Sequence, residues 1–175
     1  YSTVSALGLL TMLLGWGTRE AVAAALVYLV AHACYKGALF LVAGAIDHEA
    51  GTRDITVLAG LRRTMPITAF AGGAAALSMA GVPLTLGFVA KDGAYEALLH
   101  GGTWATWLLV LTVLASILLG LGGLLAGVVP FRGRPAEDGT HDPSWMLWLP
   151  PLTLAGAGVL AGFVPSILNG PLSAA

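Results

Sequence analysis

Charged residues are scarce in this sequence. Aspartate, glutamate, lysine and arginine make up 10% of its 175 residues, whereas a soluble globular domain carries about 25%. Hydrophobic residues reach 57%, and the mean hydropathy is +0.86. This deficit excludes an ordinary soluble domain and predicts an integral membrane protein. The formal net charge of −1 also argues against a surface that binds nucleic acid.

Cysteine is almost absent, because Cys34 is the only one. A single thiol excludes an intramolecular disulfide and supplies no second sulfur ligand for a metal. No set of His, Cys, Asp and Glu has the spacing of a metal site, no nucleophile is accompanied by its base, and no glycine-rich phosphate loop follows a strand. We therefore expect no metal, no cofactor and no catalytic residues.

The sequence also lacks an N-terminal targeting signal. It starts at Tyr1 without a methionine, no charged segment precedes the first apolar run, and no small-residue cleavage site follows it. We therefore interpret the sequence as an excerpt of a longer polypeptide and expect no signal peptide to be removed.

Apolar runs of membrane-crossing length are abundant. A helix needs about 20 apolar residues to cross a bilayer, and the frequent glycine and alanine allow such helices to approach closely. We predict that residues 1–175 are part of one all-α transmembrane domain, a polytopic helix bundle of about six spans with one discontinuous helix. The predicted spans are residues 2–16, 21–46, 66–80, 83–99, 104–129 and 145–168.

Polar residues separate these spans. Residues 47–64 and 130–143 hold most of the charges and are predicted to be solvated loops at the membrane surface. Interfacial aromatic residues are expected at the start of the last two spans, where the sequence has Trp104, Trp107, Trp145 and Trp148. Arginines fall equally on both predicted sides and give no orientation: Arg19, Arg132 and Arg134 against Arg53, Arg62 and Arg63.

Residues 66–99 form a stretch that is too long for one span, since a continuous helix would be about 50 Å long. The predicted break is Gly81-Val82-Pro83, because proline removes a helix hydrogen bond and disfavours helix in the preceding residue. Two spans are therefore expected here, with Gly87 as a further interruption just before Lys91. Broken helices at membrane depth are tolerated where they line a polar cavity.

A lysine and a histidine lie in the middle of the second span. Lys36 is near mid-depth, where a cationic side chain costs about 2.5–3.5 kcal/mol on insertion scales. His32 lies four residues earlier on the same helix face, and Tyr28 extends that stripe. Lysine can release its proton whereas arginine cannot, so the pair suits a proton relay. The alternatives are a lysine that reaches the interface or a silent salt bridge, and a hydrogen-bonded core histidine.

A second group consists of Lys91, Asp92 and Glu96. The two carboxylates are four residues apart and share a helix face, while Lys91 points about 100° away from Asp92. We expect Lys91 to meet another helix or a hydrated path, and the carboxylates to lead protons away from it. The alternative for the two acids is an interfacial helix end.

These residues resemble a known family. His32-Ala33-Cys34-Tyr35-Lys36-Gly37-Ala38-Leu39-Phe40 resembles the His-Ala-x-x-Lys-x-x-Leu-Phe motif of proton-conducting antiporter-like membrane subunits, which occur in Mrp-type multisubunit sodium/proton antiporters and in respiratory complex I. Residues 1–5 resemble the start of the preceding family helix. Residues 76–83 with 87–92 resemble its later discontinuous helix and lysine, and the loop 47–55 is closer to the A-type Mrp subunits than to complex I.

The resemblance implies about helices nine to fourteen of one such protein. Lys36 would be the central-channel lysine, assisted by His32, and Lys91 the lysine of the exit half-channel; the glutamate–lysine pair of the first half-channel would lie upstream. The chain departs from the family pattern at Val82-Pro83, where two prolines often occur, and at Ala90, where serine is usual.

The implied function is proton conduction in a multisubunit monovalent cation (Na⁺)/H⁺ antiporter of the cell membrane, with sibling subunits as partners and a proton path through His32, Lys36, Lys91, Asp92 and Glu96. Such a transporter component is not itself an enzyme. The alternative is a proton-pumping membrane component of an NADH:quinone oxidoreductase without a redox site of its own. A third hypothesis is a structural bundle with inert buried ion pairs.

Overall fold

The structure, a computed structural model, describes residues 1–99, 101–133 and 139–163. Its regular elements in these ranges are all helical, which confirms the predicted all-α membrane helix bundle. The α-helices are α1 (Ser2–Trp16), α2 (Arg19–Ala50), α3 (Pro66–Ala80), α4 (Leu86–Leu99), α5 (Gly102–Gly127) and α6 (Trp145–Phe163), and two 3₁₀ helices are η1 (Leu61–Arg63) and η2 (Val129–Phe131).

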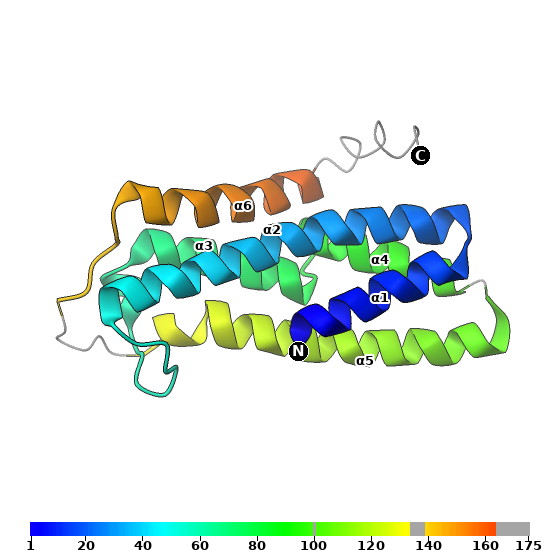
Figure 1. The fold of residues 1–175 in the computed structure, drawn as a ribbon, viewed down its shortest axis with the longest axis horizontal. Coiled ribbons are helices and arrows are strands. Elements are labelled where there is room, and N and C mark those ends of the chain that lie inside the picture. Colours follow the sequence, from blue (N-terminus) through cyan, green and yellow to red (C-terminus); the bar gives the residue numbers. More distant parts are fainter. Residues whose placement is uncertain (100, 134–138, 164–175) are drawn as a thin grey trace.

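Helix α2 is the centre of the bundle. It packs against α1, α3, α4 and α6, and α3 also packs against α5 and α6. Figure 1 shows that α3 and α4 follow each other end to end along α2 and together cover its length. The prediction of two separate crossings for residues 66–80 and 83–99 thus differs from the structure, in which the two helices form the halves of one interrupted crossing.

The interruption between α3 and α4 lies where proline and glycine predicted it. Helix α3 ends at Gly81, whose φ of 82° only glycine adopts easily, and Leu84 also has a left-handed φ of 71°. Thr85 then caps the next helix, since its hydroxyl accepts a hydrogen bond from the Phe88 N–H at 3.3 Å. The predicted interruption at Gly87 is wrong, because α4 is continuous from Leu86 to Leu99.

Helix α2 is longer than the predicted span 21–46. Its first turn is capped by Thr18, whose hydroxyl accepts a hydrogen bond from the Ala21 N–H at 3.2 Å. At the other end it continues through Asp47-His48-Glu49 and stops only at Gly51, with a φ of 65°. The prediction that Asp47 begins the polar loop is therefore wrong, since charged residues are compatible with a solvated last helical turn.

The loop after α2 is organised locally by Asp54. Its Oδ1 accepts hydrogen bonds from the Thr56 N–H at 2.9 Å and from the Thr56 hydroxyl at 2.7 Å. Both bonds stabilise the carboxylate and lower the pKa of Asp54 below its usual value. This part of the predicted surface loop is exposed, as expected. Arg134, Glu137 and Asp138 of the second predicted loop lie outside the described residues.

Three segments in the described part of the chain are long and apolar enough to cross a membrane: α2, residues 102–131, and α6. Helices α1 and α3 are apolar but shorter. Large apolar side chains are exposed along α5 and at the start of α6, where Trp104, Trp107 and Trp145 occupy the predicted boundary positions. The chain is therefore a multi-pass membrane bundle with its apolar surface turned outward. The predicted last span extends to residue 168, and residues 164–168 lie outside the described residues.

Close helix contacts depend on small residues. The backbone of α5 at Gly127 approaches that of α3 at Gly72 so closely that a Cβ on Gly127 would clash with the Gly72 carbonyl oxygen. In the same way, Gly162 of α6 lies against the backbone of Thr85 in the α3–α4 break. These contacts are of the kind expected where van der Waals packing, rather than the hydrophobic effect, holds helices together in lipid.

Candidate functional site

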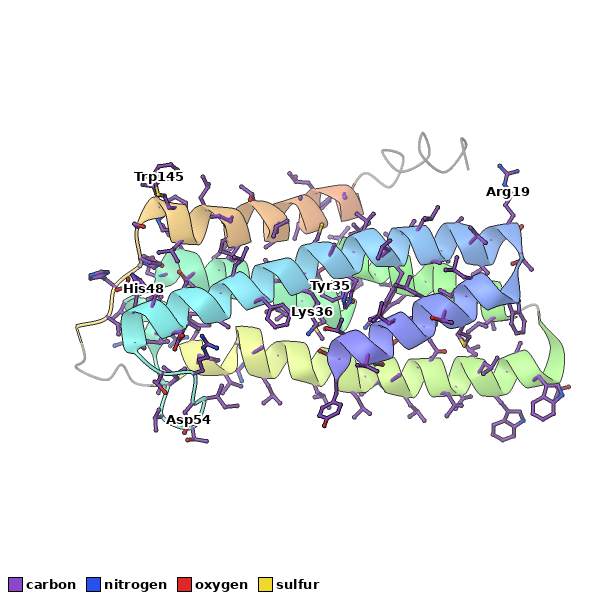
Figure 2. The ribbon with its side chains drawn as sticks, in the orientation of Figure 1. Arg19, Tyr35, Lys36, His48, Asp54 and Trp145 are labelled. Carbon is purple, nitrogen blue, oxygen red and sulfur yellow. The ribbon has the colours of Figure 1, made fainter. Side chains whose placement is uncertain are left out.

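Lys36 lies near the middle of α2. Figure 2 shows it, with Tyr35, about midway between Arg19 and His48 at the two ends of that helix. Its ammonium donates a hydrogen bond to the Ser2 hydroxyl of α1 at 2.5 Å and lies 5.4 Å from the centre of the Phe40 ring. The half-buried side chain borders a cavity of about 180 Å³ between α1, α2, α3 and α5. Lys36 is therefore held by a hydroxyl and an aromatic face.

His32 is half-buried one turn before Lys36. Its Nδ1 lies 3.2 Å from the Tyr35 hydroxyl, and the two rings meet edge to face, with centroids 5.3 Å apart. No hydrogen bond joins His32 to Lys36 among the described residues, so the predicted pair shares a helix face without direct contact between the polar atoms. The polar partner of His32 is instead Tyr35.

Lys91 is buried in the break between α3 and α4, with 7% of its surface exposed. Its ammonium donates hydrogen bonds to the carbonyl oxygen of Ala80 at 3.0 Å and to that of Ser116 at 3.4 Å. The Ala80 carbonyl belongs to the last turn of α3, where carbonyls lack a partner within the helix and carry the negative end of its dipole. The expectation that Lys91 meets another helix is confirmed, with α3 and α5 as the helices that it meets.

The two carboxylates of the second group are exposed and lie at different cavities. Asp92 lines the cavity of about 210 Å³ that also holds Lys91 and Tyr95. Glu96 instead lines a cavity of about 600 Å³ between the start of α2 and α4, opposite Glu20 and Thr18. The structure thus places Asp92, but not Glu96, beside Lys91.

Neither lysine has a carboxylate within ion-pair distance in the part of the chain that the structure describes. The oxygens that hold them are neutral, and a neutral partner stabilises an ammonium less than a carboxylate does. Neither lysine is therefore locked into a salt bridge among these residues, and lysine, unlike arginine, can release its proton.

Several of these partners were missed in the sequence. Ser2 is one of four hydroxyl residues in the apolar helix α1, and the Ala80 and Ser116 oxygens belong to the main chain. Tyr35 carried a detectable signal, because it is one helical turn from His32. The other contacts join helices that are far apart in the sequence and have no local pattern.

The described residues combine a buried and a half-buried lysine, neither with a carboxylate partner there, with an outward apolar surface. These features define a class: multi-pass membrane proteins that keep titratable groups in their interior. The comparison with known protein families identifies the family to which this chain belongs. This chain belongs to the NADH:quinone oxidoreductase/Mrp antiporter transmembrane family, whose model matches residues 1–119.

Individual relatives cover nearly the whole chain. It is 38% identical to the A/B subunit of a probable K⁺/H⁺ antiporter of Rhizobium meliloti, over 98% of this chain and 18% of the relative. It is 34% identical to the A subunit of the Na⁺/H⁺ antiporter of Alkalihalophilus pseudofirmus, over 96% of this chain and 24% of the relative. The chain thus spans about a quarter or less of the length of these curated relatives.

A solved structure also resembles the fold. A chain in the structure of the Mrp complex from Dietzia sp. DQ12-45-1b superposes with a TM-score of 0.76 and is 35% identical, over 98% of this chain and 19% of that chain. The overall helical arrangement therefore has a counterpart in a chain of the Mrp complex.

Proposed function

We propose that this chain is a segment of the A subunit of a multisubunit monovalent cation/proton antiporter in the cell membrane, and that it conducts protons. The observation that carries the proposal is Lys91, a buried lysine whose hydrogen-bond partners among the described residues are main-chain carbonyls at a helix break. The names of the relatives, which are antiporter A subunits, and the Mrp complex support the same function. Sibling subunits are the proposed partners.

In this proposal Lys36 and Lys91 are the groups that change their protonation state. When Lys91 is charged, its hydrogen bonds to Ala80 and Ser116 are charge-assisted and strong, and when it is neutral they weaken. His32 exchanges protons on the Lys36 side, and Asp92 exchanges them at the cavity of Lys91. Glu96, at its separate cavity, is the outermost group of the proposed path.

Transport in everted vesicles tests this proposal. The full-length protein and its partner subunits are incorporated, and collapse of a proton gradient is followed after addition of Na⁺ or K⁺, because the relatives differ in the named cation. We expect wild-type vesicles to respond and Lys36→Ala and Lys91→Ala to abolish the response. Arg19→Ala, an exposed basic residue at the start of α2, is the control and should transport normally.

Two results would contradict the proposal. Unchanged transport in both lysine variants would remove these residues from the ion path. Wild-type vesicles that ignore both cations but acidify on addition of NADH would place the chain in the respiratory branch of the family, whose description also includes NADH:quinone oxidoreductases.

A further inference from the structure

Three of the four tyrosines in the sequence lie on the two helices that carry Lys36 and Lys91. Tyr28 and Tyr35 belong to α2 and Tyr95 belongs to α4, and these two helices pack along each other. Tyr28 and Tyr35 are 1% and 3% exposed. Phenylalanine would fill the same space without a polar atom. Each of the three tyrosine hydroxyls is therefore expected to have a polar partner or a function.

One end of this group contacts the Lys36 site. The Tyr35 hydroxyl is 3.2 Å from His32 Nδ1, and Tyr35 directly precedes Lys36 in α2. A tyrosine hydroxyl is both a donor and an acceptor, so it can pair with either tautomer of the imidazole. The hydroxyl is thus placed to take a proton from His32 or to return one.

The other end borders the cavity of the Lys91 site. Tyr95 lies four residues after Lys91, on the same face of α4. Both side chains line the cavity of about 210 Å³ that Asp92 also borders. The Tyr95 side chain is half-buried.

Tyr28 is the third tyrosine of this group. Its ring stacks on His32, with centroids 6.3 Å apart and 19° between the planes. Its helix α2 packs along α4, which carries Tyr95. Yet its hydroxyl is fully buried and forms no hydrogen bond with any described residue. A buried hydroxyl without a partner is destabilising, and phenylalanine at this position would avoid that penalty.

We propose that Tyr35, Tyr28 and Tyr95 form a hydroxyl relay that carries protons between the His32–Lys36 site and the Lys91 site; this rests on the proposed antiporter function. Each hydroxyl accepts a proton on its oxygen and releases its own hydrogen to the next acceptor. The His32 imidazolium therefore loses one proton, the neutral Lys91 amine gains one, and every tyrosine ends neutral. A side-chain rotation or one water molecule between neighbouring hydroxyls closes the gap at Tyr28.

The test is Tyr28→Phe in the full-length protein, assembled with its partner subunits in everted vesicles. The variant removes one oxygen that makes no hydrogen bond to any described residue, so the melting temperature of the complex should not fall. If Tyr28 has only a structural role, the transport rate of the variant should also equal that of the wild type. The relay predicts a Vmax at least about tenfold lower, since a positioned proton-transfer group contributes about 10²–10⁴-fold, with an unchanged KM for the cation.

Tyr1→Phe is the matched control, because it changes the one remaining tyrosine, which is exposed. A Vmax of Tyr28→Phe within about twofold of the wild type would overturn the relay, while loss in Lys36→Ala and Lys91→Ala would leave the antiporter function standing. If Tyr28→Phe fails to assemble, Tyr95→Phe at its half-buried position decides by the same criterion. If the wild type moves protons only with NADH, the antiporter proposal fails and the effect of Tyr28→Phe on that movement decides the relay.

Discussion

The ammonium nitrogen of Lys91 and the carbonyl oxygen of Ala80 are 3.0 Å apart, across the break between α3 and α4. The lysine comes from the second half of the interrupted crossing and the oxygen from the end of the first half. A second bond, from Lys91 to the carbonyl of Ser116, extends the contact to α5. One protonated side chain therefore joins three helices through their main-chain oxygens.

Gly81→Ala should disturb this contact. A Cβ at this position would lie 2.9 Å from Lys91 Cδ, and the φ of 82° disfavours any residue other than glycine. We expect the Lys91 ammonium to be displaced, transport to fall, and the stability of the complex to drop by about 1 kcal/mol. Gly73→Ala, also in α3 but with open space around its Cβ, is the control. Both variants are compared by transport rate and by melting temperature in detergent.

Lys91→Met should separate function from stability. Methionine has a similar volume and no charge, and replacing a buried charged group by a well-packed apolar one is often neutral or stabilising. We expect the melting temperature to be preserved and cation-dependent proton movement to be lost. If Lys91 has only a structural role, Lys91→Met should transport at the wild-type rate. A variant with full activity would therefore support the structural alternative.

Ser2→Ala should affect the Lys36 site. The Ser2 hydroxyl is the hydrogen-bond acceptor of Lys36 among the described residues, and removing it leaves a half-buried ammonium without that partner. The loss of a hydrogen bond to a charged group costs about 1.5–3 kcal/mol. We expect a lower transport rate, measured in everted vesicles, and recovery in Ser2→Thr, which restores a hydroxyl. Equal transport rates in Ser2→Ala and the wild type would show that the hydrogen bond between Lys36 and Ser2 is not needed for transport.

Asp142→Ala should destabilise the start of α3 without a specific effect on the lysines. The Asp142 carboxylate accepts hydrogen bonds from the Ile67 N–H at 3.0 Å, the Thr68 N–H at 3.1 Å and the Thr68 hydroxyl at 2.8 Å. It thus caps α3 from the segment that leads into α6, and losing a cap costs about 0.5–2 kcal/mol. A lower melting temperature with an unchanged KM for the cation is the expected result. An unchanged melting temperature would contradict the capping role.

The sequence was informative where a local signal determines the structure. Pro66 and Gly81 mark helix ends at the predicted residues, because proline and glycine act on the backbone at their own position. The far end of α2 was misjudged, since Asp47 and its neighbours are charged but still helical. Polarity alone does not tell a loop from a solvated last turn.

The position of Lys36 and Lys91 within apolar segments could also be predicted from the sequence, because the cost of a charge in lipid depends on the residue and its sequence neighbours. Their partners were not readable. Ser2, Ala80 and Ser116 are 34, 11 and 25 residues from the lysines that they bind. Such contacts depend on how the helices pack, and two of the three acceptors are main-chain oxygens that any residue type carries.

The contact of Gly162 with Thr85 has a mechanical consequence. The backbone of helix α6 at Gly162 packs directly against the backbone of the turn that joins α3 to α4, because glycine has no side chain to separate them. If the turn opens or tightens as Lys91 gains or loses its proton, α6 must shift with it. The affinity of a neighbouring protein that binds α6 would then depend on whether Lys91 is protonated. By reciprocity, binding of that protein would change the proton affinity of Lys91.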